Sequence, residues 1–128
     1  MFREMMKSKL HLGAVTEAEF LYVGSVSIDE DLMDAANLLT NERVTVVNRN
    51  NGARFETYVI PAPRGSGSIC MNGPAARLTQ VGDRVLVISY AMMEDSEARK
   101  HKPIVVVLNE KNEPQPYPGE EQHGTTVG

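Results

Sequence analysis

The chain has 128 residues, of which 41% are hydrophobic and 23% charged, and a formal net charge of −4. This length and composition are typical of one globular domain with a sizeable core. The acidic balance, without a compact stripe of Lys or Arg, argues against nucleic-acid binding. No apolar run is long enough to cross a bilayer, so no membrane association is expected.

The cellular compartment is indicated by cysteine content and by the N-terminal segment. Cys70 is the only cysteine, which excludes an internal disulfide and fits a reducing compartment. The opening sequence, MFREMMKSKLH, lacks the apolar region of a signal peptide. We therefore expect a cytoplasmic protein.

In chain order, most segments have the composition of short strands separated by turn signals. Leu21–Ile28 is strand-like around a Gly-Ser step, and Asp29–Leu39 has the apolar spacing of a helix. Alternating residues predict strands at Glu42–Asn48 and Arg54–Ile60. Asn51-Gly52 between them supplies the positive φ angles of a tight hairpin.

The second half of the chain adds further strands and then changes character. Strands are predicted at Ile69–Met71, Arg84–Ala91 and Ile104–Leu108, with a helical turn at Glu94–Lys100. Residues 109–128 are rich in Pro, Gly, Glu and Gln and cannot bury enough apolar surface to stay in place. We expect a mainly β fold, a barrel in residues 1–108, with small helices and a flexible tail at 109–128.

Common catalytic and metal-binding patterns are missing from the sequence. The three histidines are scattered, and no Cys/His spacing indicates a metal site. Gly65–Ser68 lacks the Lys-Ser/Thr ending of a phosphate-binding loop. The unusual feature is Gly24-Ser25, because glycine weakens strands and marks a bulge or a close backbone approach. On these residues alone, the step is either a β-bulge or a reactive site.

Four stretches, matching in order and spacing, carry a resemblance to a known family. They are K-L-H at Lys9–His11, Y-V-G-S-V-S-I-D at Tyr22–Asp29, N-G-A-R-F-E-T-Y-V-I at Asn51–Ile60 and R-G-S-G-S-I-C-M-N-G-P-A-A at Arg64–Ala76. Up to about Leu108, the chain resembles the bacterial aspartate 1-decarboxylases, which are pyruvoyl enzymes of the pantothenate pathway. The resemblance implies a six-stranded double-psi β-barrel, assembled as a homotetramer with sites between subunits.

The resemblance further implies that the chain cleaves itself between Gly24 and Ser25, into a beta chain (1–24) and an alpha chain (25–128). The Ser25 hydroxyl would attack the Gly24 carbonyl, which the bare glycine Cα leaves accessible. Elimination and hydrolysis would then convert Ser25 into a covalent pyruvoyl group. Thr57 matches the threonine that supports this step at the scissile carbonyl. Neither a metal nor pyridoxal phosphate is expected.

The activity implied is conversion of L-aspartate to β-alanine and carbon dioxide through a Schiff base on the pyruvoyl group. Tyr58 matches the proton donor of the family. Arg54 and Lys9 match cations that hold the substrate carboxylates. The other expected substrate-binding residues are Thr57, Asn72, Gly73, Pro74 and Ala75. Because Thr57 and Tyr58 face opposite sides of a flat strand, they can share a pocket only at a barrel end or a subunit boundary.

The sequence departs from the family pattern at two positions, and two rival functions are weighed against the decarboxylase. Val47 stands where many relatives have tryptophan, and Pro74 replaces a frequent alanine, which bears on substrate affinity rather than reaction type. One rival is an uncleaved, non-catalytic barrel that binds small acids or serves assembly. The other is a pyruvoyl decarboxylase for another acidic amino acid, such as glutamate. His11 either orients groups during processing or is a structural histidine.

Overall fold

The computed structural model describes residues 1–117, 119 and 121–126, and strands are its dominant regular structure. The strands are β1 (Phe2–Ala14), β2 (Glu17–Glu19), β3 (Ser25–Asp29), β4 (Arg43–Asn48), β5 (Arg54–Ala62), β6 (Ile69–Asn72), β7 (Arg84–Glu94), β8 (Ile104–Leu108) and β9 (Pro114–Gln115). The helices are α1 (Glu30–Ala35), the 3-10 helix η1 (Gly73–Leu78) and α2 (Asp95–Ala98). The prediction of a mainly β fold with small helices is confirmed, with nine strands in the described residues where six were expected.

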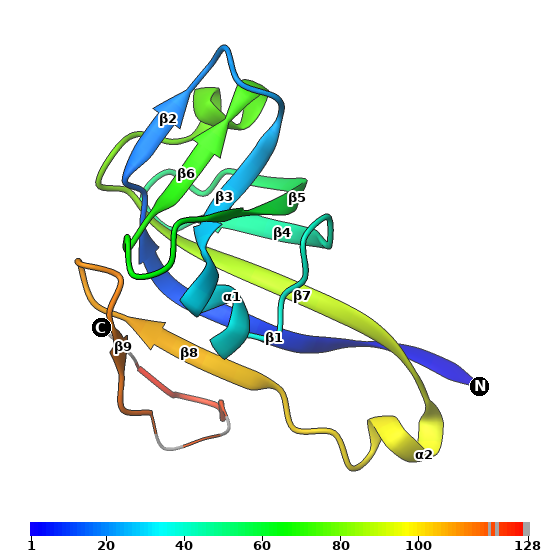
Figure 1. Cartoon of the computed structure of the whole chain (residues 1–128). Coiled ribbons are helices and arrows are strands. Elements are labelled where there is room, and N and C mark those ends of the chain that lie inside the picture. The colour runs from blue at the N-terminus through cyan, green and yellow to red at the C-terminus, as the bar shows by residue number, and fades with distance from the viewer. Residues whose placement is uncertain (118, 120, 127–128) are drawn as a thin grey trace.

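All nine strands belong to one sheet, in the order β2-β6-β3-β5-β4-β7-β1-β8-β9 (Figure 1). β3 lies between β5, to which it is parallel, and β6, to which it is antiparallel. Ser25 is paired with Asn72 across the β3–β6 ladder. The sheet therefore brings three of the four sequence motifs together, on adjacent strands.

The longest strand, β1, is not among the predicted elements. It pairs antiparallel with β7 from Phe2 to Ala14 and parallel with β8 on its other edge. The outer parts of β1 and β7 leave the body of the molecule as an arm that leads to α2 (Figure 1). Pairing along both edges, and not a local apolar pattern, makes this segment a strand, because strand formation depends strongly on neighbouring strands.

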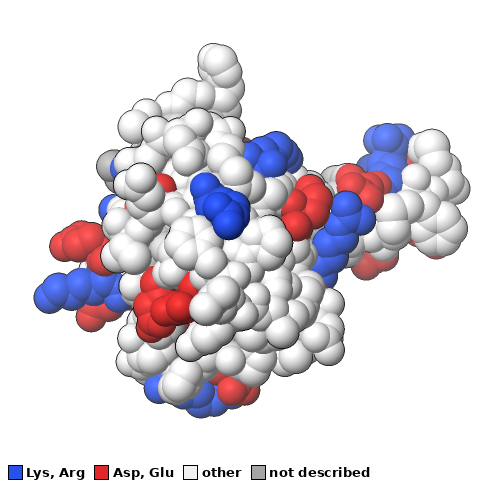
Figure 2. Space-filling view, turned by 90° about the horizontal axis from the view of Figure 1, so that it is seen from above, with Lys and Arg blue, Asp and Glu red and all other residues white. Residues whose placement is uncertain are grey.

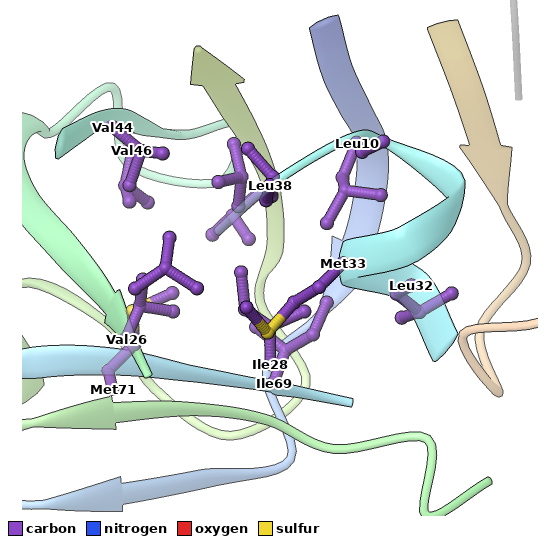
Figure 3. Packing of buried hydrophobic residues seen from close by; sticks show 14 of the residues in the cluster. Leu10, Val26, Ile28, Leu32, Met33, Leu38, Val44, Val46, Ile69 and Met71 are labelled. Carbon is purple, nitrogen blue, oxygen red and sulfur yellow. The ribbon is translucent and has the colours of Figure 1, made fainter. Parts of the chain in front are cut away.

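The core is formed by side chains from strands that are far apart in the sheet order. Leu10 of β1, Val26 of β3 and Ile69 of β6 are fully buried in one cluster (Figure 3). The sheet must therefore curl around its own apolar face. Leu32 and Met33 of α1 pack on the same cluster. Burying a side chain of this size stabilises the fold by roughly 1.5–3 kcal/mol.

Helix α1 is shorter than the predicted segment Asp29–Leu39. The Asp29 carboxylate caps it by accepting the N–H of Asp31 at 2.8 Å. At the other end, Asn37 has a φ of 54°, a left-handed conformation that ends the helix. Leu39, expected on the apolar face, is consequently 70% exposed.

The predicted hairpin between β4 and β5 is confirmed, with a looser connection than expected. Its loop covers residues 49–53, and the N–H of Gly52 donates to the carbonyl of Asn48 at 2.8 Å. Of the Asn51-Gly52 pair, only Gly52 has a positive φ, at 77°. The turn is thus a longer loop and not a two-residue connection.

The start of the segment expected to be flexible is packed on the sheet. The Asn112 side chain is buried, donates to the carbonyls of Ala14 at 2.9 Å and Gly67 at 2.8 Å, and accepts the Ala14 N–H at 2.7 Å. Strand β9 pairs with β8. Hydrogen bonds to backbone groups hold this polar segment, which a composition rule based on apolar burial does not detect. The domain division at Leu108 stays a prediction.

The surface shows no single-sign charge patch on the face seen in Figure 2, where acidic and basic groups are small and interspersed. Elsewhere in the described residues, Arg64 of the loop after β5 forms ion pairs with Glu30, Asp31 and Asp34. Among the described residues, no helix is long and apolar enough to span a membrane. In that same part of the chain, no three His, Cys, Asp or Glu side chains are grouped to hold a metal ion.

Candidate functional site

The Gly24–Ser25 step lies at the point where β3 begins. Ser25 is fully buried, and its hydroxyl oxygen accepts a hydrogen bond from the Asn72 side-chain amide at 2.9 Å. The same hydroxyl donates to the carbonyl of Val23 at 3.2 Å. The β3–β6 ladder produces this contact, because it places Asn72 directly opposite Ser25. A buried serine with both hydrogen-bonding functions engaged is held in one orientation.

The turn that follows β6 packs directly against Gly24. Gly73 has a φ of 62°, and a Cβ at this position would lie 2.8 Å from the Gly24 Cα and 2.9 Å from the Tyr22 carbonyl oxygen. Any other residue at position 73 would have to displace backbone atoms as well as adopt a strained φ. A Cβ at Gly24 would meet the Pro74 ring at 3.4 Å. The two glycines therefore permit a backbone contact at the proposed cleavage site.

A cavity of about 350 Å³ opens beside this contact. It is lined by Gly24, Phe55, Glu56, Thr57, Tyr58, Pro74, Ala75 and Leu78. The β3–β5 ladder begins only at Val26 and Val59, so the edge of β5 is open at Thr57 and Tyr58. Residues from both faces of β5 reach the cavity for this reason. Thr57 and Tyr58 face opposite sides of a flat strand, but here both line one cavity because the β3–β5 ladder ends beside them.

Arg54 lines a second cavity, of about 500 Å³, which shares Glu56 with the first. Glu56 is held by the hydroxyl of Thr45 at 2.8 Å and by Arg43 at 3.4 Å. Arg54 pairs with Val47 in the β4–β5 ladder, and its side chain makes no hydrogen bond or ion pair with any described residue. Its guanidinium is thus available to an anion near the Gly24 cavity.

Lys9 lies elsewhere in the chain, on β1, and lines neither of these cavities. Its side chain is 9% exposed and pairs with Glu121. His11, two residues on, lines a third cavity together with Arg49 and Glu121. Burial, followed by the charge of Lys9, lowers the pKa of His11. Within this chain, neither Lys9 nor His11 lines the cavity at Gly24.

One residue of the Ser25 environment, Cys70, was not predicted from the sequence. Cys70 donates from its thiol to the Asn72 side-chain oxygen at 3.1 Å, and the Asn72 amide also donates to Ser27 at 2.8 Å. Burial, with the carboxylates of Glu17 and Glu19, raises the pKa of the Cys70 thiol to about 11. The thiol thus keeps its proton at neutral pH. The i, i+2 spacing of Cys70 and Asn72 was the available signal, since it places both side chains on one strand face.

Comparisons with known proteins agree over almost the whole chain. Residues 1–115 match the model of the aspartate decarboxylase family. An aspartate 1-decarboxylase of Bacillus licheniformis is 60% identical over 127 residues, covering 99% of this chain and 100% of that protein. One from Heliobacterium modesticaldum is 62% identical over 112 residues, 88% of this chain and 85% of its own.

Among solved structures, the rationally designed protein mkDPBB_sym_86 has a TM-score of 0.44 and 18% identity, and covers 66% of this chain and 91% of its own. That likeness is too distant to carry an argument. The family match and the relatives are decisive, because they combine high identity with nearly complete coverage of both partners. The chain belongs to the aspartate decarboxylase family of enzymes.

Proposed function

We propose that this chain is the precursor of a pyruvoyl-dependent decarboxylase, which cleaves itself between Gly24 and Ser25 and then converts L-aspartate to β-alanine and carbon dioxide for pantothenate biosynthesis. Family membership supports the reaction type. The observation that carries the site assignment is the buried Ser25 hydroxyl. It is held by Asn72 at 2.9 Å and follows a glycine packed against the backbone of Gly73.

Cleavage begins with an acyl shift from nitrogen to oxygen. The Ser25 Oγ bonds to the Gly24 carbonyl carbon, the C–N bond to Ser25 breaks, and the hydroxyl proton ends on the freed nitrogen. The Asn72 amide stabilises the negative charge that develops on Oγ as the proton leaves. Thr57, which lines the same cavity, is our proposed donor to the carbonyl oxygen.

The chain then separates by elimination. Ser25 loses its Cα proton, and the carboxylate of Gly24 leaves from Cβ, which yields a chain ending at residue 24. Water then hydrolyses the remaining dehydroalanine. Its nitrogen departs as ammonia, and the pyruvoyl ketone is left. These steps need no oxidant or metal ion, because every electron pair stays within the bonds that form and break.

The residues around position 25 fit a small covalent ketone. The position is buried, Asn72 provides an amide donor, and the absence of a side chain at Gly73 lets the turn after β6 pack against Gly24. The pyruvoyl group, once formed, supplies an acceptor for the electron pair released as carbon dioxide leaves. Our proposal includes neither pyridoxal phosphate nor a metal.

Substrate binding requires fixed positive charge, because aspartate has two carboxylates. We assign one carboxylate to Arg54, whose guanidinium can hold it through parallel hydrogen bonds. Tyr58, on the wall of the Gly24 cavity, holds the proton that is returned to the α-carbon. Asn72 and the turn of Gly73, Pro74 and Ala75 close the site around position 25.

Lys9 is the second proposed cation, and it requires an oligomer. We propose a homotetramer with sites between subunits, in which Lys9 of one subunit serves the Gly24 cavity of its neighbour. An exposed apolar loop supports this assembly. The four residues directly before Gly24 are apolar and exposed: Phe20 (55%), Leu21 (97%), Tyr22 (59%) and Val23 (76%). Contiguous exposed apolar residues mark interfaces. A reducing, cytoplasmic location is part of the same proposal.

A competition assay tests the activity. The purified protein is incubated with L-aspartate, L-glutamate or both, and carbon dioxide, β-alanine and 4-aminobutyrate are quantified. Preferential formation of β-alanine supports the proposal, whereas preference for glutamate favours the rival substrate. Ser25→Ala is the matched control. Decarboxylation by that variant would contradict the assignment of position 25.

A further inference from the structure

We propose that Cys70 is a positioning residue for self-cleavage, because its thiol proton fixes the orientation of the Asn72 amide and so directs an N–H donor to Ser25 Oγ. The inference rests on the proposed function, which makes Ser25 the nucleophile of the cleavage. It adds a residue outside those implied by the family resemblance.

The register of β3 and β6 places four polar side chains next to one another. Cys70 and Asn72 are two residues apart on β6 and share one face. On β3, Ser25 is paired with Asn72 and Ser27 with Cys70. These four side chains form a compact polar cluster in which Ser25, Cys70 and Asn72 are buried.

The hydrogen bonds of the cluster run from Cys70 to Asn72 and from Asn72 to the two serines. The Asn72 side-chain nitrogen donates to Ser25 Oγ at 2.9 Å and to Ser27 Oγ at 2.8 Å. Its side-chain oxygen accepts from the Cys70 thiol at 3.1 Å. Both amide protons and the amide oxygen are therefore engaged, as expected for a buried asparagine.

The two ends of an asparagine amide have nearly the same shape, so hydrogen bonds decide which end points where. If the Asn72 amide were turned over, its oxygen would accept from the serine hydroxyls, and its NH₂ would face the sulfur. A thiol that keeps its proton is a donor and favours the oxygen as its neighbour. Burial raises the pKa of the Cys70 thiol to about 11, so the donor is present at neutral pH.

The orientation of the amide determines the state of the nucleophile. With the NH₂ directed to Ser25, the hydroxyl oxygen accepts a hydrogen bond, while the hydroxyl proton is directed to the Val23 carbonyl at 3.2 Å. A donor is then in place when negative charge develops on Oγ. In the reversed orientation, Ser25 would donate to Asn72, and Oγ would have lost this donor. Cys70 thus acts on the cleavage through Asn72.

The test compares cleavage rates of freshly synthesised full-length chains, followed by intact mass at neutral pH. Cys70→Ala is expected to slow cleavage about tenfold, the effect of one misdirected hydrogen bond on a barrier. Cys70→Ser, which retains an O–H donor, is expected to restore the rate to within about threefold of the unmutated chain. Ile69→Val is the packing control, since it removes one buried methylene next to Cys70. It should lower the melting temperature without slowing cleavage.

Two outcomes would overturn the inference: cleavage of Cys70→Ala at the unmutated rate, or equal slowing of the Ala and Ser variants. Failure of the unmutated chain to cleave would count against the proposed function instead. The orientation is still measurable in that case, by NMR of ¹⁵N-labelled Ser25→Ala precursor. A nuclear Overhauser effect from the Asn72 NH₂ to Ser27 Hβ, lost on adding Cys70→Ala, supports the inference. An identical signal in both proteins would refute it.

Discussion

Gly73 contacts the backbone of Gly24 so closely that a Cβ on residue 73 would lie 2.8 Å from the Gly24 Cα. We predict that Gly73→Ala displaces the segment before Ser25 and abolishes self-cleavage. Gly52→Ala is the matched control, because Gly52 also has a positive φ, of 77°, but its Cβ would meet nothing within 4 Å. It should cost about 1–2 kcal/mol in stability and still cleave. Intact mass and thermal unfolding measure both effects, and cleavage of Gly73→Ala at a normal rate would refute the role of this contact.

Tyr58→Phe separates maturation from turnover. Tyr58 lines the Gly24 cavity, and we assign its phenol to protonation of the α-carbon only. The variant should process normally and show a kcat lowered about 100-fold or more, the usual contribution of a general acid. Steady-state kinetics on fully cleaved protein check this. If kcat is unchanged, the proton donor is another group.

Glu121→Gln is expected to strengthen substrate binding. The Glu121 carboxylate pairs with Lys9, so it competes with the substrate carboxylate that we assign to the same ammonium. A partly exposed pair contributes roughly 0.7 kcal/mol, which corresponds to a KM about threefold lower in the variant. Glu113→Gln is the control, since Glu113 bonds to Asn109 within the tail at 3.0 Å. An unchanged or higher KM for Glu121→Gln would show that the tail does not compete for Lys9.

The pH dependence of stability has a specific source in Glu42. Burial acts to raise the pKa of this carboxyl, but hydrogen bonds from Lys7, Ser89 and the N–H of Leu39 outweigh it, and the pKa lies below its usual range. A depressed folded pKa contributes stability above the ordinary value of roughly 4.3, and this is lost as the pH falls through the folded value.

Glu42→Gln should therefore destabilise the protein at pH 7 and matter less at low pH. Urea unfolding of both proteins at pH 7 and at about pH 3.5 measures the difference in unfolding free energy. We predict that the difference shrinks on acidification. A constant difference would show that the Lys7–Glu42 ion pair, 2.8 Å long, is not the titrating contact.

Local signals in the sequence predicted much of the sheet. The β4–β5 hairpin and strands β6, β7 and β8 follow from alternation, β-branched residues and turn chemistry. Strand β1 was missed because its partners on both edges are distant in the chain. The end of α1 was missed because it depends on the positive φ of one residue, Asn37, and the spacing of apolar residues does not predict that angle.

The candidate site, like the fold, could be predicted from the sequence only in part. Motifs indicated Gly24, Ser25, Thr57 and Tyr58, and the fold brings Gly24, Thr57 and Tyr58 to one cavity, with Ser25 next to Gly24 in the chain. Lys9 does not line the cavity that holds Gly24, Thr57 and Tyr58, and the homotetramer proposed to bring it there is not determined by a single chain. The role proposed for Cys70 was missed because it arises from the contact of its thiol with the Asn72 side chain, and an isolated buried cysteine gives no sign of such a contact.

The measurement that tests the central claim most directly is the intact mass of the purified protein under denaturing conditions. We predict two chains, one ending at Gly24 and one beginning at residue 25 and lighter than its unmodified sequence by one ammonia. Ser25→Ala should give a single folded, full-length chain. A single full-length mass for the unmutated protein, even after prolonged warming, would contradict the account and favour an uncleaved binding barrel.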